Sequence, residues 1–336
     1  MSKVVVLGSG GWGIALAIKA YNNGHNVSLW TPFQEEANTL ASKRESEKLL
    51  KGIKIPDDIN ISTDINVANG VDAIIIATPS FAVRETAKRL STLSDVKLVV
   101  NVAKGLDKEN QDRLSVVIRE YLPKTNIVIL SGPSHAEEVA IGIPTSLVAA
   151  SESLDSAVLV QELLSGNTLR IYTGDDVVGA EFGGAFKNII AVAAGICDGM
   201  KLGDNTKAAM MTRGLSEVAR LGVKLGAREE TFAGLTGVGD LIVTCTSKHS
   251  RNYRFGYLVG SGKDVNEALA EVGTVEGYHA AKLAFNLSKK EDVELPIIES
   301  VYLTLYEGFS VAEMIKKLMT RPSKAEYEKS WLTNKQ

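Results

Sequence analysis

Near its start the chain contains the run Val4-Val-Val-Leu-Gly8-Ser-Gly10-Gly-Trp-Gly13, followed at once by the apolar stretch 14–21. The aliphatic residues predict a buried strand, and the stretch after the glycines predicts a helix. Gly8 permits the tight turn between them, Gly10 lets the backbone approach a pyrophosphate, and Gly13 allows close helix packing. Free N–H groups at the helix start favour an anion. The run therefore predicts a dinucleotide-binding unit, with a glycine turn that binds nothing as the alternative.

The rest of the first half repeats this alternation of short apolar runs and amphipathic stretches. The expected strands are 4–7, 26–31, 73–77, 97–102, 127–130, 145–149 and 168–172. Most are continuously hydrophobic, which is typical of buried parallel strands. The alternation indicates an α/β fold with a Rossmann-like doubly wound sheet, in which ligands bind beyond the carboxyl ends of the strands.

The pattern changes after Asp176. From there the chain has long helical segments separated by glycine-rich turns, and only residues 241–245 could pass for a strand. We therefore expect a dinucleotide-binding domain over residues 1–180. An all-α substrate-binding and catalytic domain is expected over residues 181–336.

Composition excludes several classes of protein. The 45% hydrophobic and 23% charged content of the 336 residues is that of a globular enzyme, and a net charge of −3 gives no reason to expect nucleic acid as a partner. Cys197 and Cys245 lie in apolar runs without metal-ligand spacing, which indicates reduced thiols and no bound metal. No basic and apolar leader precedes Val4, and no uncharged run reaches the roughly eighteen residues of a membrane span. We expect a cytoplasmic protein without integral membrane association.

One lysine, Lys187, is the only charged residue in the stretch 182–197. An ammonium among small and apolar side chains loses hydration, so it either reaches solvent along its stem or lies in a cleft where its proton is used. Taken alone, the stretch favours a core helix whose lysine reaches solvent. Polar motifs elsewhere in the chain change this interpretation and favour a catalytic lysine.

Two of these motifs follow predicted strands. Lys104 comes directly after strand 97–102, where its side chain would lie at the ligand-binding edge of the sheet. Ser134 follows strand 127–130 and forms a capping-box pattern with Glu137. Free N–H groups at that helix start could hold substrate oxygens. A solvated loop lysine and a purely structural cap remain the alternatives.

Two further motifs lie in the second half. Asp240 and Thr244 are four residues apart and share one face if this segment is helical. Ser250 resembles a helix cap with Arg251 in the first turn and Asn252 beside it. A guanidinium fork, helix N–H groups and an amide suit a phosphate. The structural alternatives are a carboxylate at a helix N-terminus and a solvated basic helix end.

Ketone reduction by hydride leaves an alkoxide, which needs a proton and a nearby positive charge. Lys187 can provide both, and general acid catalysis works best when the pKa of the lysine is lowered toward neutrality. Lys104 is a candidate for the second cation that lowers it. An ion pair with Asp240 would raise the pKa of Lys187, so we expect Asp240 to hold the lysine in position rather than to tune its charge.

The second predicted strand ends Leu29-Trp-Thr-Pro-Phe33, without the acidic residue that usually binds the adenine ribose. Glu35 and Glu36 come a turn later, and no arginine stands nearby to bind a 2′-phosphate. The choice between NAD and NADP therefore stays open from the residues alone.

Together, six segments resemble the bacterial NAD(P)-dependent glycerol-3-phosphate dehydrogenases. They are GSGGWG (8–13), NVAKGLD (101–107), LSGPSHAEEV (130–139), GGAFKNIIAVAAGICDG (183–199), GLTGVGDLIVTCTSKHSRN (234–252) and VEGY (275–278). The resemblance implies reversible reduction of dihydroxyacetone phosphate to sn-glycerol 3-phosphate with NADH or NADPH, supplying glycerol phosphate for phospholipid synthesis. Where many relatives carry a basic residue after the second strand, this chain has Pro32 and Phe33, so the resemblance does not extend to a preference for NADPH, and the expected cofactor is NAD or NADP.

The resemblance also implies roles for individual residues, with Lys187 as proton donor and acceptor. Around the substrate it implies Lys104, Gly132, Ser134, Lys187, Asp240, Ser250, Arg251 and Asn252. Near the cofactor it implies Gly11, Trp12, Lys104, Ala136, Arg251 and Glu276, beside the loop glycines Gly8, Gly10 and Gly13. The alternatives are a related two-domain hydroxyacid dehydrogenase and a non-catalytic NAD(P)H sensor. For the assembly we expect a homodimer, as the commonest closed oligomer.

Overall fold

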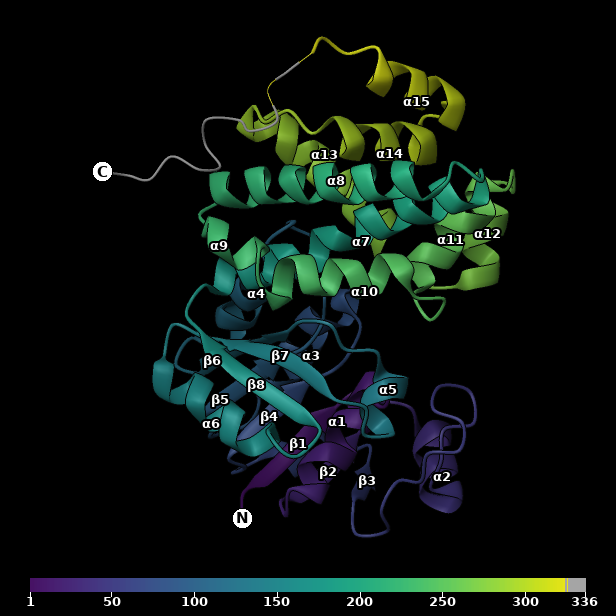
Figure 1. The fold of residues 1–336 in the computed structure, drawn as a ribbon. Helices are drawn as coiled ribbons and strands as arrows, with labels where there is room; N and C mark the ends of the chain where they lie inside the picture. Colours follow the sequence, from purple (N-terminus) through teal and green to yellow (C-terminus); the bar gives the residue numbers. More distant parts are fainter. Residues whose placement is uncertain (324, 326–336) are drawn as a thin grey trace.

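The structure is a computed structural model that describes residues 1–323 and 325. Figure 1 shows two parts, a sheet flanked by helices and a stack of helices, which meet around the long helix α7 (Val177–Gly199). The expected end of the helical domain, residue 324 and residues 326–336, lies outside the described residues.

The first part is an eight-stranded sheet in the order β3-β2-β1-β4-β5-β6-β7-β8. Strands β1 to β6 pair in parallel, β7 is antiparallel to β6, and β8 is parallel to β7. The strand order reverses at β1 and β4, which defines the crevice where doubly wound sheets bind ligands. The Rossmann-like prediction is confirmed. The strands are β1 (Lys3–Leu7), β2 (Asn26–Trp30), β3 (Asn60–Ser62), β4 (Ala73–Ile76), β5 (Leu98–Asn101), β6 (Asn126–Ser131), β7 (Thr145–Ala150) and β8 (Leu169–Gly174).

Two features of the sheet differ from the sequence-based expectation. Strand β3 was not predicted, because its three residues at the sheet edge have no continuous apolar run. The reversal of β7 was not predicted either, since hydrophobicity shows that a strand is buried but not which way its neighbour runs.

Alternate residues of β1 bury against opposite faces of the sheet. Val4 and Val6 face the core formed with α1 and α6, whereas Val5 and Leu7 face α3, α4 and the first turn of α7. The helices of this part are α1 (Gly11–Asn22), α2 (Gln34–Lys43), α3 (Val83–Leu90), α4 (Leu114–Tyr121), α5 (Ala136–Ala140) and α6 (Leu154–Leu164), with 3-10 turns η1 (Ile65–Ala68) and η2 (Ser80–Ala82).

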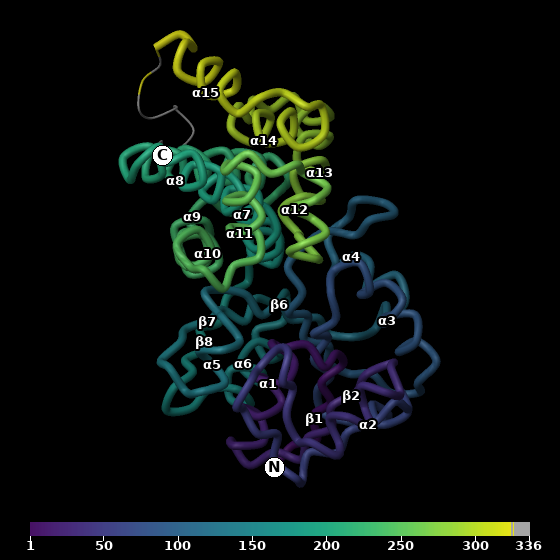
Figure 2. The backbone as a smooth tube through the Cα atoms, turned by 90° about the vertical axis from the view of Figure 1, so that its right-hand side faces the viewer, coloured from purple at the N-terminus to yellow at the C-terminus, as the bar shows by residue number. Residues whose placement is uncertain are grey.

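The second part is helical and surrounds α7, as Figure 2 shows from the side. Residues 241–245 belong to helix α10, so they do not form a strand. The elements after α7 are α8 (Asp204–Lys224), α9 (Glu229–Phe232), the π-helical turn η3 (Leu235–Gly239), α10 (Asp240–Thr246), α11 (Arg251–Gly260), α12 (Val265–Val272), α13 (Glu276–Glu291), α14 (Pro296–Tyr306) and α15 (Val311–Met319). By length and composition α7 could cross a membrane, but 94% of its most apolar window is buried inside the protein, as in a core helix.

Helices α7 and α11 cross with their backbones almost in contact. A Cβ atom added to Gly195 would lie 2.1 Å from the carbonyl oxygen of Tyr253, and one added to Gly256 would lie 2.0 Å from that of Val192. No other residue type fits at either position without moving a helix. This crossing fixes α11 close to the segment of α7 that carries Lys187.

Candidate active site

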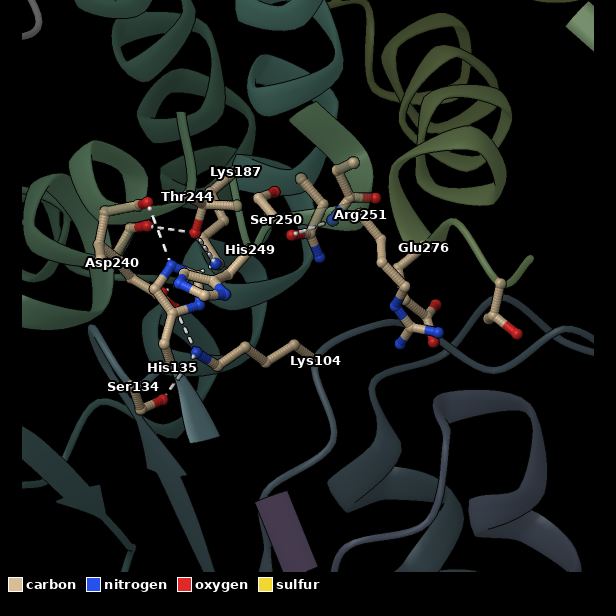
Figure 3. A pocket seen from close by; sticks show the side chains of 14 residues that line it. Lys104, Ser134, His135, Lys187, Asp240, Thr244, His249, Ser250, Arg251 and Glu276 are labelled. Carbon is tan, nitrogen blue, oxygen red and sulfur yellow. Dashed lines mark hydrogen bonds and ion pairs between the residues drawn. The ribbon is translucent and has the colours of Figure 1, made fainter. Parts of the chain in front are cut away.

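A cavity of about 150 Å³ lies where the sheet part meets the helical part (Figure 3). Three lining residues follow strands β5 and β6, and the others come from the helical part. The lining consists of Lys104, Ser134, His135, Lys187, Asn188, Asp240, Val243, Thr244, His249, Ser250, Arg251, Asn252, Thr274 and Glu276. It includes seven of the eight residues expected around the substrate, and the eighth, Gly132, contacts Lys104.

Lys187 is held inside the cavity wall by α10. Its side chain is 5% exposed, and Nζ lies 2.8 Å from Oδ1 of Asp240. The same ammonium donates to Oγ1 of Thr244, whose hydroxyl donates to the carbonyl oxygen of Asp240. Asp240 and Thr244 share one helical face, as their spacing predicts. An ammonium has three N–H donors, so Lys187 keeps one donor available to a ligand.

A second lysine binds the same carboxylate. Nζ of Lys104 lies 2.7 Å from Oδ2 of Asp240 and donates to the carbonyl oxygen of Gly132 at 2.9 Å. Asp240, 1% exposed, therefore bridges the two lysines across the boundary between the two parts. Sequence reasoning expected Lys104 and Asp240 to act on Lys187, but it did not predict that one carboxylate would pair with both lysines.

The pKa of Lys187 falls to about 8 because burial disfavours its charged form. The ammonium of Lys104 lowers it further, whereas the carboxylate of Asp240 raises it. Burial outweighs the ion pair, and Lys104 acts in the expected direction as a second cation.

The expected capping box at Ser134 is wrong. Helix α5 begins at Ala136 after His135, and no side chain caps its start. The hydroxyl of Ser134 instead donates to the carbonyl oxygen of Gly132 at 3.0 Å and accepts from Lys104 at 3.4 Å. The local pattern fails because the N-cap is His135, one residue beyond Ser134, so the serine is not at the capping position.

The start of α11 forms another side of the cavity. Ser250 accepts from the backbone N–H of Tyr253 at 3.2 Å, which confirms it as the cap, and its hydroxyl hydrogen stays available. Asn252 accepts from the N–H of Gly277 at 2.8 Å and donates to Oδ1 of Asn188 at 2.9 Å. Arg251 is exposed and makes no hydrogen bond or ion pair with any residue in the described part of the chain. Its guanidinium is therefore free to bind an anion.

The glycine loop fits a dinucleotide. Gly8 has φ +118°, and a Cβ there would lie 2.7 Å from the carbonyl of Ala77. A Cβ on Gly13 would meet the oxygen of Gly8 at 1.9 Å, whereas one on Gly10 would meet nothing within 4 Å. The loop is thus tightly packed at both ends and open at Gly10, where the sequence predicts the approach of a pyrophosphate.

Two other expected cofactor residues lie beside this loop, and a third closes the cavity. A Cβ on Gly11 would lie 3.5 Å from that of Ala136, and Trp12 packs partly against the sheet core. Glu276 lies across the boundary between the sheet part and the helical part, where both its carboxylate oxygens accept from the hydroxyl of Ser80, at 2.9 and 2.8 Å. Burial raises the pKa of Glu276.

Sequence reasoning missed several lining residues. Asn188, His135 and His249 each directly follow or precede a residue that was predicted, so adjacency was the signal that could have found them. The ring centroids of the two histidines lie 5.7 Å apart, with one histidine from the sheet part and one from the helical part. Nothing in the sequence pairs Ser80 with Glu276, which are 196 positions apart.

Two family models and several curated relatives that match this chain are described as glycerol-3-phosphate dehydrogenases. The family model described as NAD-dependent glycerol-3-phosphate dehydrogenase N-terminus matches residues 3–157, and the one for the C-terminus matches residues 176–316. An NAD(P)+ glycerol-3-phosphate dehydrogenase of Clostridium perfringens is 48% identical over 97% of this chain and 99% of the relative. One from Fusobacterium nucleatum is 46% identical over 98% of this chain and 100% of the relative.

A solved structure agrees with these relatives. The glycerol-3-phosphate dehydrogenase of Coxiella burnetii superposes with a TM-score of 0.91 at 35% identity, covering 95% of this chain and 99% of that one. The matches span both parts of the molecule, the glycine loop and the lysine cluster. The chain therefore belongs to the NAD-dependent glycerol-3-phosphate dehydrogenase family.

Proposed function

We propose that this protein is an oxidoreductase that reversibly reduces dihydroxyacetone phosphate to sn-glycerol 3-phosphate, with NADH or NADPH as cofactor. One observation carries the proposal. Lys187 is buried and fixed by Asp240 and Thr244, yet it lines a cavity between a dinucleotide-binding sheet and the free guanidinium of Arg251. A proton donor, a cofactor cradle and an anion ligand thus meet in one place.

Lys187 acts as the general acid. A nicotinamide bound at the glycine loop would supply the hydride to the carbonyl carbon of the substrate. The free donor of Lys187 then gives its proton to the developing alkoxide, and in the reverse direction the neutral amine accepts the proton from the alcohol. A pKa of about 8 keeps both forms populated near neutral pH. Lys104 contributes a second positive charge, which stabilises the same oxygen electrostatically.

The phosphate is assigned to the start of α11. Arg251 offers two parallel N–H donors, and Ser250 and Asn252 offer a hydroxyl hydrogen and an amide hydrogen. Phosphate binding is remote from the reacting carbon, so its binding energy serves to orient the carbonyl against Lys187. Because α11 crosses α7 at backbone contact, the distance between this phosphate site and Lys187 is fixed by the two helices.

A spectrophotometric assay tests the proposal. Purified protein should oxidise NADH or NADPH with dihydroxyacetone phosphate and reduce NAD⁺ or NADP⁺ with sn-glycerol 3-phosphate. Dihydroxyacetone without phosphate and a 2-keto acid should be far poorer substrates, since neither presents a phosphate to Arg251. Equal turnover of the 2-keto acid would favour a hydroxyacid dehydrogenase, and cofactor binding without any turnover would favour a sensor.

We further propose that the enzyme is cytoplasmic, forms a homodimer and supplies glycerol phosphate for phospholipid synthesis. Support for a reducing compartment comes from Cys197 and Cys245, both buried and unpaired. Cell fractionation and sedimentation of the purified protein test location and assembly.

A further inference from the structure

We propose that the hydrogen-bonded pair Thr31 and Glu36 makes this enzyme select NADH over NADPH. The inference rests on the proposed function only in assuming that a nicotinamide dinucleotide binds to the glycine loop. It concerns the adenosine end of that cofactor, away from the lysine cluster.

The end of β2 touches the glycine loop. The backbone N–H of Gly8 donates to the carbonyl oxygen of Trp30 at 2.8 Å, so the next residue, Thr31, lies at the edge of the cradle. Thr31 is 1% exposed, and its N–H donates to the carbonyl oxygen of Ser62 at 3.1 Å. Both the position and the backbone of Thr31 are therefore fixed by the sheet.

Thr31 directs a carboxylate to this edge. Its hydroxyl donates to Oε2 of Glu36 at 2.6 Å, across five positions of sequence. Glu36 lies in the first turn of α2, so without this bond its side chain would be free to extend into solvent. No described residue donates to the other oxygen, Oε1, which stays available as an acceptor. The carboxylate of Glu36 thus takes the place of the acidic residue that is missing from the end of β2.

A carboxylate at this place distinguishes the two cofactors. It accepts a hydrogen bond from a ribose 2′-hydroxyl, as acidic residues at the end of the second strand do in dinucleotide folds. A 2′-phosphate would instead bring negative charge to the carboxylate and remove the donor.

Two arginines close to β2 and α2, Arg89 over the ring of Trp30 and Arg44 at the end of α2, already have protein partners. Arg44 donates to the carbonyl oxygens of Ile59 and Asp57, at 2.8 and 2.7 Å. Arg89 pairs with Glu85 at 3.1 Å. Both guanidinium groups are engaged with the protein. A 2′-phosphate would have to compete for them, whereas a 2′-hydroxyl needs neither.

Equilibrium binding to the cofactor-free protein tests the proposal without turnover. Isothermal titration with 5′-AMP and with 2′,5′-ADP reports the adenosine end alone. Wild type should bind 5′-AMP more tightly by on the order of tenfold. Glu36→Gln should bring the two affinities to within about threefold. Thr31→Val keeps the charge of Glu36 but removes the hydrogen bond that holds its carboxylate in place. It should therefore reduce the preference for 5′-AMP over 2′,5′-ADP only in part. The kcat/KM ratio for NADH over NADPH should change in parallel.

Glu35→Gln is the matched control, because it removes a neighbouring exposed carboxylate of the same helix turn. It should retain the wild-type preference. Tighter binding of 2′,5′-ADP by wild type, or an unchanged preference in a folded Glu36→Gln protein, would overturn the proposal. Loss of dihydroxyacetone phosphate turnover with the nucleotide preference intact would instead count against the proposed function alone.

Discussion

The two cationic sides of the cavity are built in opposite ways. Lys187 and Lys104 are both bound to the buried Asp240, and Lys187 is also held by Thr244. Arg251, at the start of α11, is exposed and makes no hydrogen bond or ion pair in the described part of the chain, although its charge acts on the nearby carboxyl group of Glu276. The two lysines are therefore held in place by the protein itself, whereas the guanidinium of Arg251 is not held by a hydrogen bond or ion pair within the described residues.

The difference reflects what each group does. A proton donor needs a fixed position and a shifted pKa, and only burial among fixed charges provides both. An anion ligand needs neither, because the substrate itself brings the countercharge. An exposed guanidinium stays hydrated until then, so leaving Arg251 unpaired incurs no desolvation penalty. The predictions below remove or alter one side at a time.

Lys187→Met should have the largest effect, because it removes the proton donor and keeps the apolar stem. The kcat for reduction should fall by about 10²- to 10⁴-fold, while NADH binding measured by fluorescence changes little. Lys224→Met, at the exposed end of α8, is the control and should keep full activity. Undiminished turnover in Lys187→Met would remove the lysine from the mechanism.

Asp240→Asn should come next, since it leaves two ammonium groups without their shared countercharge. Breaking a buried ion pair costs about 3–5 kcal/mol of unfolding free energy, which urea denaturation would measure. Loss of the carboxylate should also lower the pKa of Lys187 and move the alkaline decline of reduction to lower pH. Asp155→Asn, an exposed carboxylate of α6, should do neither. An unshifted pH profile would show that Asp240 does not interact with the protonated lysine.

Arg251→Ala should act on affinity more than on rate. A charge-assisted hydrogen bond contributes about 1.5–3 kcal/mol, so KM for dihydroxyacetone phosphate should rise roughly 10- to 150-fold, with a smaller change in kcat. Arg254→Ala, one turn further along α11, provides the comparison. An equal KM in Arg251→Ala and wild type would assign the phosphate elsewhere.

The pH dependence should follow the lysine side alone. Reduction requires the protonated lysine, so kcat/KM should decline as pH rises through the pKa of about 8, by roughly tenfold per unit beyond it. Oxidation of the alcohol requires the neutral amine and should rise over the same range. Parallel profiles in the two directions would contradict a single group acting as acid and base.

Ser80→Ala should have the smallest effect. It removes the hydroxyl that donates to Glu276 across the domain boundary. One neutral donor to a carboxylate supports a change of about threefold to tenfold in KM for the cofactor, with kcat preserved. Ser91→Ala, a hydroxyl at the end of α3, is a suitable control. An unchanged KM would limit Ser80 to a structural contact.

Sequence patterns predicted those features of the molecule that are determined by residues close together in the chain. The glycine run, the buried strands β1, β2, β4 and β5 and the shared helical face of Asp240 and Thr244 all follow from short-range patterns. The cluster of Lys104, Lys187 and Asp240 joins segments far apart in the chain, so its contacts had no local signature. Sequence reasoning did not assign Glu36 to the adenine ribose because it lies beyond the end of β2. The hydrogen bond from Thr31 is what holds its carboxylate at that end.

The wrong or missing predictions have separate physical causes. The Ser134 capping pattern was not realised because helix α5 starts one residue later, with His135 at the N-cap, and Ser134 bonds to Gly132 and Lys104 instead. Residues 241–245 resembled a strand because a short apolar run is expected for a buried strand and also for a short buried helix such as α10. Strand β3 was invisible because pairing with β2, rather than its own hydrophobicity, makes it a strand.

The glycine crossing of α7 and α11 bears on how this enzyme could evolve. No rotatable side chain separates the two helices there, so the span from Lys187 to the residues at the start of α11 is set by main-chain contact. One added methyl at Gly195 or Gly256 would displace α11 as a unit and carry Arg251 and Asn252 away from the lysine. Longer or shorter substrates should therefore not become accessible through single substitutions at the crossing. New substrate ranges should arise instead in the loops that carry His135 and His249, where side chains can change without altering that span.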